Sequence, residues 1–285
     1  MNDMKLKKKL LTIMLASLIT FVIFAAGTNL GVAQAASKTY PALLKINDYY
    51  VLYTTPKPPY VDSQDRIMIP LRSISELFGA KVTYDTKNKT ATISMDDKTV
   101  NFTIGSKTVM VNGTANQMDT IPVLDKNSMF IPISVLVHHL GIQSTWDQLN
   151  RLYRLTGDNL MQTDIIKYTL EDMEGGAMAA PPGKIISNDA FMPVSYTYDP
   201  TKSSFTIKSK NITGNDIPKG AEDVTPYILT DNGVQFPNHN RVRPAVKKDG
   251  IIEMSVQSGS LNLDGSMKSV EYLLVKGRLL DRSSS

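Results

Sequence analysis

The sequence predicts an α+β, β-rich fold in which a duplicated small strand–helix–strand module precedes an antiparallel β-sandwich, Ig-like in the loose sense. Two observations predict it. In the first half, punctuating residues recur at one constant spacing, and in the second half short alternating apolar runs are separated by turn residues. A length of 285 residues with 42% hydrophobic residues suits two modest domains, each with its own core.

The repeat is defined by residues that recur 62 positions apart. The matching pairs are Pro70 and Pro132, Gly79 and Gly141, Tyr84 and Trp146, and Asp85 and Asp147. Four matches at one spacing indicate an internal duplication, with copies over about 46–106 and 107–158. Because Tyr84 and Trp146 occupy equivalent alternating strand positions, core packing is expected for Trp146.

Each copy is expected to contain a short helix between two strands. Pro70 suits the first helical position, and Gly79 suits the left-handed residue just past the helix end. The expected buried helix face comprises Leu71, Ile74, Leu77 and Phe78, and the expected solvent face comprises Arg72, Ser73, Ser75 and Glu76. A helix of about eight residues is too short to be stable alone, so it must pack on the sheet.

The stretch from Arg66 to Asp85 also carries a resemblance. It contains an apolar pair, Pro-Leu-Arg, a Glu four residues on, Leu-x-Gly-Ala and Val-x-aromatic-Asp. Together these motifs resemble the copper amine oxidase N-terminal domain. That family is a small α/β module, often in tandem in secreted proteins of Gram-positive bacteria, and the likeness covers about 46–158. The second copy departs from the pattern, with Ser134, His138 and Ile142 at the positions of Arg72, Glu76 and Ala80.

The resemblance implies a stalk-like, non-catalytic role, because in the oxidase this domain is separate from the catalytic machinery. The resemblance implies what a catalytic domain of a copper amine oxidase would contain: a modified tyrosine inside Asn-Tyr-Asp or Asn-Tyr-Glu, and three histidine ligands. Neither tripeptide occurs here, and the chain has only 3 histidines. We therefore expect no amine oxidase activity and no cofactor.

The N-terminus has the pattern of a secretory signal peptide over residues 1–35. Four lysines (Lys5, Lys7, Lys8 and Lys9) precede an apolar run from Leu10 to Ala26, and Ala33-Gln34-Ala35 forms an A-x-A site. Cleavage is expected after Ala35, which makes the protein secreted, extracellular or wall-associated. An uncleaved membrane anchor is the alternative. The chain has 0 cysteines, which excludes disulfides, thiol catalysis and thiolate metal sites.

Most of the formal charge of +4 belongs to that leader. Residues 1–35 hold four lysines and one aspartate, which leaves about +1 for the mature chain. Nucleic acid is therefore not expected as a partner.

Two groups in the first half are candidates for a site. Tyr49, Tyr50, Tyr53 and Tyr60 form the densest aromatic cluster, which indicates either a glycan-stacking surface or the ordinary tyrosine content of strands. His138 and His139 are adjacent on a helix, so they point about 100° apart and do not converge on one ion. No metal site is predicted from them.

After a first domain over 36–158, a small-residue stretch over 159–184 reads as a linker or long loop, and 185–285 as the β-sandwich domain. Within this β-sandwich domain, the strongest candidate for a binding segment is the loop from Phe236 to Pro244. His239, Arg241 and Arg243 on this loop suit an anionic group. A solvated loop between strands is the alternative.

The predicted function is that of a secreted, non-catalytic cell-envelope or extracellular stalk and binding protein. A cell-wall polymer, a glycan or another extracellular protein is the expected partner, and a membrane is expected only through an uncleaved signal segment. The alternative is a hydrolase or metal-dependent enzyme with a site around His239.

Overall fold

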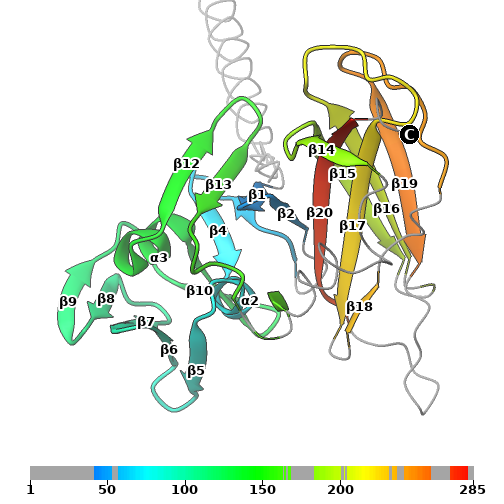
Figure 1. The fold of residues 1–285 in the computed structure, drawn as a ribbon. Coiled ribbons are helices and arrows are strands. Elements are labelled where there is room, and N and C mark those ends of the chain that lie inside the picture. The colour runs from blue at the N-terminus through cyan, green and yellow to red at the C-terminus, as the bar shows by residue number, and fades with distance from the viewer. Residues whose placement is uncertain are drawn as a thin grey trace, which may run out of the picture. The chain divides into compact units, whose positions relative to one another are not determined.

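The computed structural model describes residues 42–52, 57–162, 164, 166–167, 183–199, 202, 204–230, 233–235, 241–257 and 270–281 (Figure 1). The predicted signal peptide, its cleavage site at Ala35 and most of the predicted linker lie outside these residues. Within them, two α-helices with defined bounds accompany several sheets of mostly antiparallel strands. The β-rich α+β class predicted from the sequence is confirmed.

One sheet has five antiparallel strands in chain order. They are β5 (Lys81–Asp85), β6 (Thr90–Met95), β7 (Lys98–Thr103), β8 (Thr108–Val111) and β9 (Thr114–Gln117). Apolar residues alternate along these strands, and the buried ones include Ala91, Ile93, Val100, Phe102 and Val109. Between β8 and β9, Asn112 and Gly113 have φ of 47° and 81°, as a two-residue hairpin turn requires.

A four-stranded sheet leads into both helices. Its order is β10 (Val123–Asp125), β11 (Ser128–Pro132), β4 (Ile67–Pro70) and β3 (Tyr60–Val61). β4 runs directly into α2 (Leu71–Leu77), and β11 runs into α3 (Ile133–Leu140). Pro70 has φ −70° and ψ 115°, so it is the N-cap of the helix. The prediction that Pro70 is the first helical residue is therefore wrong by one position. Pro70 stays extended because it still pairs with Phe130 in the ladder.

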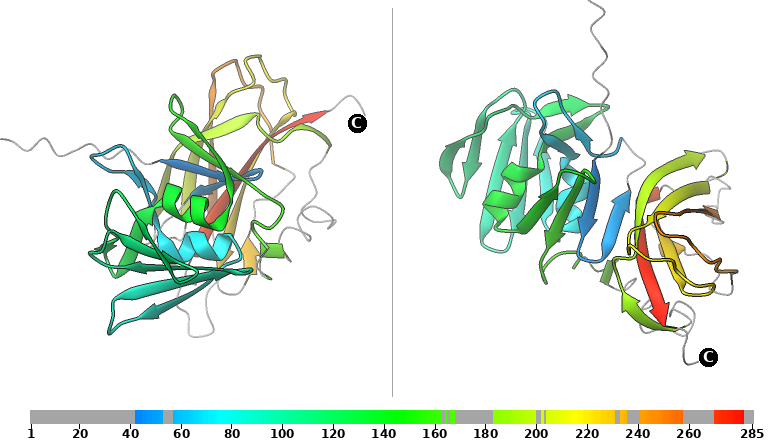
Figure 2. Two further views of the ribbon diagram at one scale, coloured as in Figure 1. Left: turned by 90° about the vertical axis from the view of Figure 1, so that its left-hand side faces the viewer. Right: turned by 90° about the horizontal axis from the view of Figure 1, so that it is seen from above.

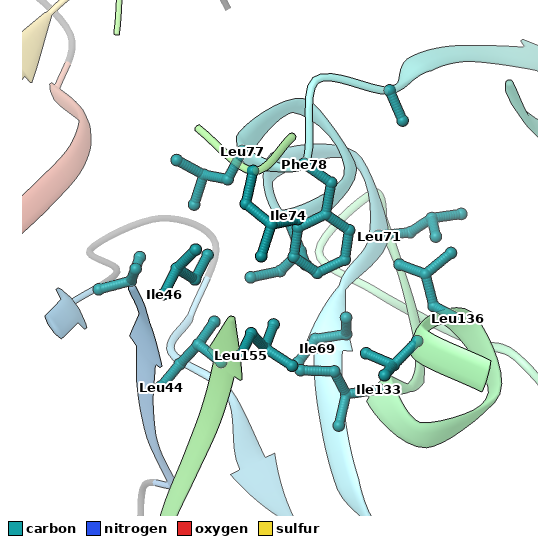
Figure 3. Packing of buried hydrophobic residues seen from close by; sticks show 14 of the residues in the cluster. Leu44, Ile46, Ile69, Leu71, Ile74, Leu77, Phe78, Ile133, Leu136 and Leu155 are labelled. Atoms are coloured by element: carbon teal, nitrogen blue, oxygen red, sulfur yellow. The ribbon is translucent and has the colours of Figure 1, made fainter. Parts of the chain in front are cut away.

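The apolar face of α2 packs as predicted (Figure 3). Its buried side chains are Leu71, Ile74, Leu77 and Phe78, which join a cluster with Leu44, Ile46, Ile69, Ile133, Leu136 and Leu155. Ser75 was expected in water, but it is fully buried. The reason is that β4, β5 and β11 all contact this short helix, so its exposed face is narrower than the sequence pattern implies.

Backbone pairing repeats at the spacing of 62 residues in the loops and strands after the helices. β12 (Gln143–Asp147) pairs with β13 (Leu152–Thr156) in the register that β5 keeps with β6. The Asp85 carboxylate accepts hydrogen bonds from the Asn88 backbone N at 3.0 Å and its Nδ2 at 2.7 Å. Asp147 accepts the same two bonds from Asn150, at 3.0 and 2.7 Å.

The largest sheet has eight strands and draws on both halves of the chain. Its path is β12, β13, β1 (Leu43–Ile46), β2 (Tyr49–Leu52), β20 (Val270–Asp281), β17 (Glu222–Thr230) and β18 (Gly233–Gln235), and β14 (Lys184–Ser187) also pairs with β20. β1 and β13 are parallel, and the other pairs are antiparallel. The join is the pairing of Tyr50 with Val275, Val51 with Leu274 and Leu52 with Leu273.

A three-stranded antiparallel sheet completes the second half. It consists of β15 (Phe191–Asp199), β16 (Ser204–Asn211) and β19 (Ile251–Gln257), in that order. The sequence predicted strands near each of these segments. The described strands after residue 183 are thus divided between this sheet and the eight-stranded one.

β20 is buried on both faces and contributes residues to two hydrophobic cores. Its ribbon is the red arrow in the right-hand view of Figure 2. On one face, Leu274 joins the cluster that contains the residues of α2 and α3. On the other face, Leu273 and Val275 join Phe191 and Phe205 from the three-stranded sheet. The first predicted domain therefore contributes β1 and β2 to a sheet whose remaining strands include β17 and β20 from the second.

Candidate functional site

The tyrosine cluster predicted to stack on a glycan is largely inside the protein. Tyr49 and Tyr50 are both buried, because β2 lies in the middle of the eight-stranded sheet and its two faces are covered. Tyr60 is half-buried with its ring centroid 5.6 Å from that of Phe130. Tyr53 lies outside the described residues. The predicted stacking surface is therefore not formed by Tyr49 and Tyr50.

The two arginines predicted to bind an anion already bind carboxylates of the protein. Arg241 forms a bidentate pair with Glu222, with its two terminal nitrogens at 2.6 and 2.7 Å from the two carboxylate oxygens. Arg243 donates to Asp223 at 3.1 Å. Both carboxylates are fully buried at the start of β17. These guanidinium groups anchor the chain after the loop, which corrects the prediction that they face a ligand.

Asp223 is also the centre of a buried ion pair across the shared sheet. Arg278 on β20 donates from Nε to Asp223 Oδ2 at 2.7 Å, and both side chains are almost fully buried. Burial alone would lower the pKa of Arg278, but Tyr227 and Asp223 together raise it. Because the pair joins β17 to β20, its role is structural.

A second polar cluster lies on the opposite face of the sheet around Asp189. Its carboxylate pairs with Lys45 at 3.0 Å and with Arg154 at 3.0 Å, and Tyr50 donates its hydroxyl at 3.2 Å. Partial burial would raise the pKa of Asp189, but Lys45 and Arg154 outweigh it and lower the value. Burial and the Asp189 charge raise the pKa of Tyr50. The cluster ties the loop before β15 to β1, β2 and β13.

The histidines do not form a metal site in the described part of the chain. The rings of His138 and His139 meet edge to face with centroids 5.1 Å apart. Burial and the neighbouring His138 lower the pKa of His139. Among the described residues, no three His, Asp or Glu side chains gather closely enough to hold an ion. His239, on which the alternative enzyme hypothesis depends, lies outside them.

A pocket of about 350 Å³ opens beside Tyr84, where sequence analysis expected no site. Its lining includes Arg72 from α2, Tyr84 from β5 and Leu124 from β10, all of which are exposed. Tyr84 is 39% exposed and Leu124 52% exposed. The signal that could have indicated it is Arg72, a charged residue that the sequence analysis placed on the solvent face of the helix.

Trp146 is the counterpart of Tyr84 and is 41% exposed, so the predicted core packing is wrong. Its ring centroid lies 6.3 Å from that of Tyr153, its partner across the ladder. The alternation correctly placed Trp146 on the core face of its strand. However, β12 is an edge strand whose neighbour in the sheet is β13, so no second described strand flanks Trp146.

A second pocket, of about 340 Å³, is more apolar. Pro58 and Pro59 line it from one side and Tyr196 and Tyr198 of β15 from another. Burial raises the pKa of Tyr196 to about 12, so its hydroxyl is a neutral donor at physiological pH. The Tyr198 ring stacks on Phe205 with centroids 4.5 Å apart, which leaves it fixed in the wall.

Two comparisons bear on what this arrangement is. Residues 45–155 match the family model of the copper amine oxidase N-terminal domain. A search of the curated proteins gives no match. Neither α2 nor α3, nor any other helix in the described ranges, has the length and apolarity needed to cross a bilayer.

Proposed function

Residues 45–155 belong to the copper amine oxidase N-terminal domain family, and from this premise we propose that the protein is a secreted, non-catalytic support of the cell envelope or extracellular space. In copper amine oxidases this domain is a non-catalytic, stalk-like unit, and the match does not extend to a catalytic domain. The N-terminal pattern of lysines, apolar run and Ala33-Gln34-Ala35 supports secretion.

One observation carries the proposal of a support: β2 of the matched domain pairs with β20 of the C-terminal half. A sheet that continues from one half into the other holds both in a fixed relation, as a presenting stalk requires. The ion pair of Asp223 with Arg278 and the cluster of Asp189 with Lys45 reinforce the same strands. The charged groups near the join thus stabilise the scaffold.

The support is proposed to consist of two copies of one module. The equal bonds of Asp85 with Asn88 and of Asp147 with Asn150 favour a duplication, as does the common register of the following hairpins. The C-terminal half is proposed to act as a β-sandwich on this support. The shared cluster of Phe191 and Phe205 with β20 favours that arrangement.

The proposed setting is association with a cell-wall polymer or surface glycan. The test uses mature protein that begins at Ala36, mixed with purified Gram-positive cell walls and centrifuged. Co-sedimentation above a control protein of similar charge is expected. If the mature protein stays in the supernatant with walls and with isolated surface glycans, the wall-association proposal is wrong.

Secretion has its own test, because the wall experiment does not address it. When the full chain is expressed in a Gram-positive host, N-terminal sequencing of the extracellular protein is expected to begin at Ala36. Retention of an intact N-terminus in the membrane fraction would instead support the uncleaved anchor.

A further inference from the structure

The pocket beside Tyr84 combines a ring, an aliphatic side chain and a cation around one cavity. Tyr84 and Leu124 offer exposed apolar surface from two different strands, β5 and β10. Arg72 lines the same cavity of about 350 Å³ from α2. A volume of this size holds one sugar ring or a molecule of similar size.

Neither Arg72 nor Tyr84 is engaged elsewhere in the described part of the protein. Arg72 is exposed and has no hydrogen bond, ion pair or ring contact there, in contrast to Arg241 and Arg243, which are paired with buried carboxylates. A guanidinium without a protein partner is available for a bidentate pair with a carboxylate or phosphate. Positive charge thus selects an anionic ligand.

The rest of the lining favours a polyol over an aliphatic acid. Ser73, Asn127 and Ser128 add hydroxyl and amide groups that donate and accept hydrogen bonds at the same cavity. The flat face of Tyr84 gives apolar area against which the C–H face of a pyranose packs. A ring with hydroxyl groups and one negative charge satisfies all of these groups together.

The equivalent positions 62 residues later show which groups of the pocket recur. Trp146 retains an exposed aromatic ring at the position of Tyr84, but Ser134 replaces Arg72. The aromatic surface is therefore common to both positions, and the cation belongs to the first alone. This contrast supplies an internal comparison for charge recognition.

We propose that the Tyr84 pocket binds a sugar unit that carries a carboxylate, with Arg72 pairing the carboxylate and Tyr84 stacking on the ring. This inference rests on the proposed association with an envelope glycan and names the ligand class and the site.

The test is calorimetric titration of mature protein with a short galacturonic acid oligomer and with its methyl-esterified, uncharged form. The acidic oligomer is expected to bind and the esterified one to bind at least about tenfold more weakly, the factor that corresponds to one charged hydrogen-bonding pair. No binding of the acidic oligomer at tens of millimolar overturns the proposal. Equal binding of an oligoaspartate peptide also overturns it, because charge alone would then be recognised.

Variants locate the site. Arg72→Gln and Tyr84→Ala are each expected to weaken acidic-oligomer binding about tenfold, whereas Tyr84→Phe retains the ring and binds as the parent does. Lys107→Gln removes one exposed positive charge outside the pocket and is the matched control. Thermal unfolding of each variant verifies that the fold is intact. Unchanged affinity in both Arg72→Gln and Tyr84→Ala means that the site lies elsewhere.

The pocket and the wall proposal fail in different ways. If the parent co-sediments with walls and folded Tyr84→Ala co-sediments equally, the pocket proposal is wrong and the wall proposal stands. If the parent does not co-sediment, the wall proposal is wrong, and the oligomer titration still decides the pocket. Trp146 is the chain's 1 tryptophan, so its fluorescence shows whether the ligand has bound at the second aromatic position.

Discussion

Ile69 and Ile131 pair directly across the adjacent strands β4 and β11, and they are the equivalent residues of the two 62-residue segments. The flanking pairs are Phe130 with Pro70 and Pro132 with Met68. Replacing each residue by its equivalent in the other 62-residue segment turns one pair into the other. The ladder therefore has a local two-fold relation centred on these isoleucines. Both are fully buried in the same hydrophobic core, in which Figure 3 labels Ile69.

Ile131→Ala is expected to lower the free energy of unfolding by about 3 kcal/mol, because it leaves a cavity beside both helices. Ile69→Ala should cost a similar amount, since its surroundings are related by the two-fold. Urea unfolding measures both. The matched control is Ile251→Ala, at an exposed residue of β19, which should change stability by less than about 0.5 kcal/mol. A loss below about 1 kcal/mol at Ile131 would contradict the packing.

The glycines after the two helices should respond differently to alanine. Gly79 and Gly141 have φ of 76° and 74°, so alanine at either costs about 1 kcal/mol in the left-handed region. At Gly141 a Cβ would also lie 2.7 Å from the Lys98 Nζ, which donates to the Leu140 carbonyl at 2.7 Å. Gly141→Ala is therefore expected to be the more destabilising of the two.

A double-mutant cycle separates these effects. In a Lys98→Met background the excess cost of Gly141→Ala over Gly79→Ala should disappear, because the lysine bond is already absent. An excess that persists in that background would place its cause outside the lysine contact.

Removing one partner of the buried pair between Asp223 and Arg278 should be costly. Arg278→Met is expected to destabilise the protein by about 3 kcal/mol, because a buried carboxylate loses its closest cation. Lys208→Met, which breaks an exposed pair with Glu253, is the control and should cost less than about 1 kcal/mol. Chemical denaturation of the two variants compares them directly, and equal losses would contradict a structural role for the buried pair.

The Asp189 cluster predicts a pH dependence of stability. The pKa of Asp189 is lower in the folded state than in the unfolded chain, so its contribution is present above the unfolded value of about 4 and is lost as pH falls through the folded value. Asp189→Asn should therefore destabilise the protein at about pH 6 and have a smaller effect at about pH 3. Urea midpoints of the two proteins at both pH values test it. An effect that grows toward acid would reverse the sign and contradict the assignment.

The shared sheet predicts that the two cores unfold together. Calorimetry of the mature chain should give one transition, and Trp146 fluorescence should follow it, because β20 is common to both cores. Leu274 and Val275 belong to different cores. Leu274→Ala and Val275→Ala should nevertheless both lower the midpoint temperature of the same transition. Two separated transitions would show instead that the halves are independent domains.

Local signals predicted much of this structure. Pro70 and Gly79 bracketed a helix within a residue or two. Asn112-Gly113 at a hairpin turn and the alternating apolar residues of β6 and β7 are local signals of the same kind. These features depend on backbone preferences of a few neighbouring residues, which a sequence displays directly.

Long-range pairing was not predictable in the same way. The contact of Tyr50 with Val275 joins strands more than two hundred positions apart, and no turn or spacing indicates it. One signal was present: Leu273-Leu274-Val275 is apolar without alternation, as in a strand that is buried on both faces.

The predictions for the candidate site residues differ from the structure for two physical reasons. Alternation gives the face of a strand but not its distance from the sheet edge, so Trp146 was expected in the core although it lies at an edge. For Tyr49 and Tyr50 the sequence left a stacking surface and ordinary strand packing open, and their burial favours the second. The loop arginines Arg241 and Arg243 looked available because their partners are Glu222 and Asp223, in a β17 segment whose burial the sequence did not show.

The position of β20 has a mechanical consequence. Its ladder bonds to β2 and β17 run across the strand axis, so tension applied to the chain beyond Asp281 and directed along β20 loads many of them at once, in shear. A strand held in shear resists extraction better than a hairpin that is peeled apart one bond at a time. A chain pulled in that direction would keep β20 in register with its neighbours.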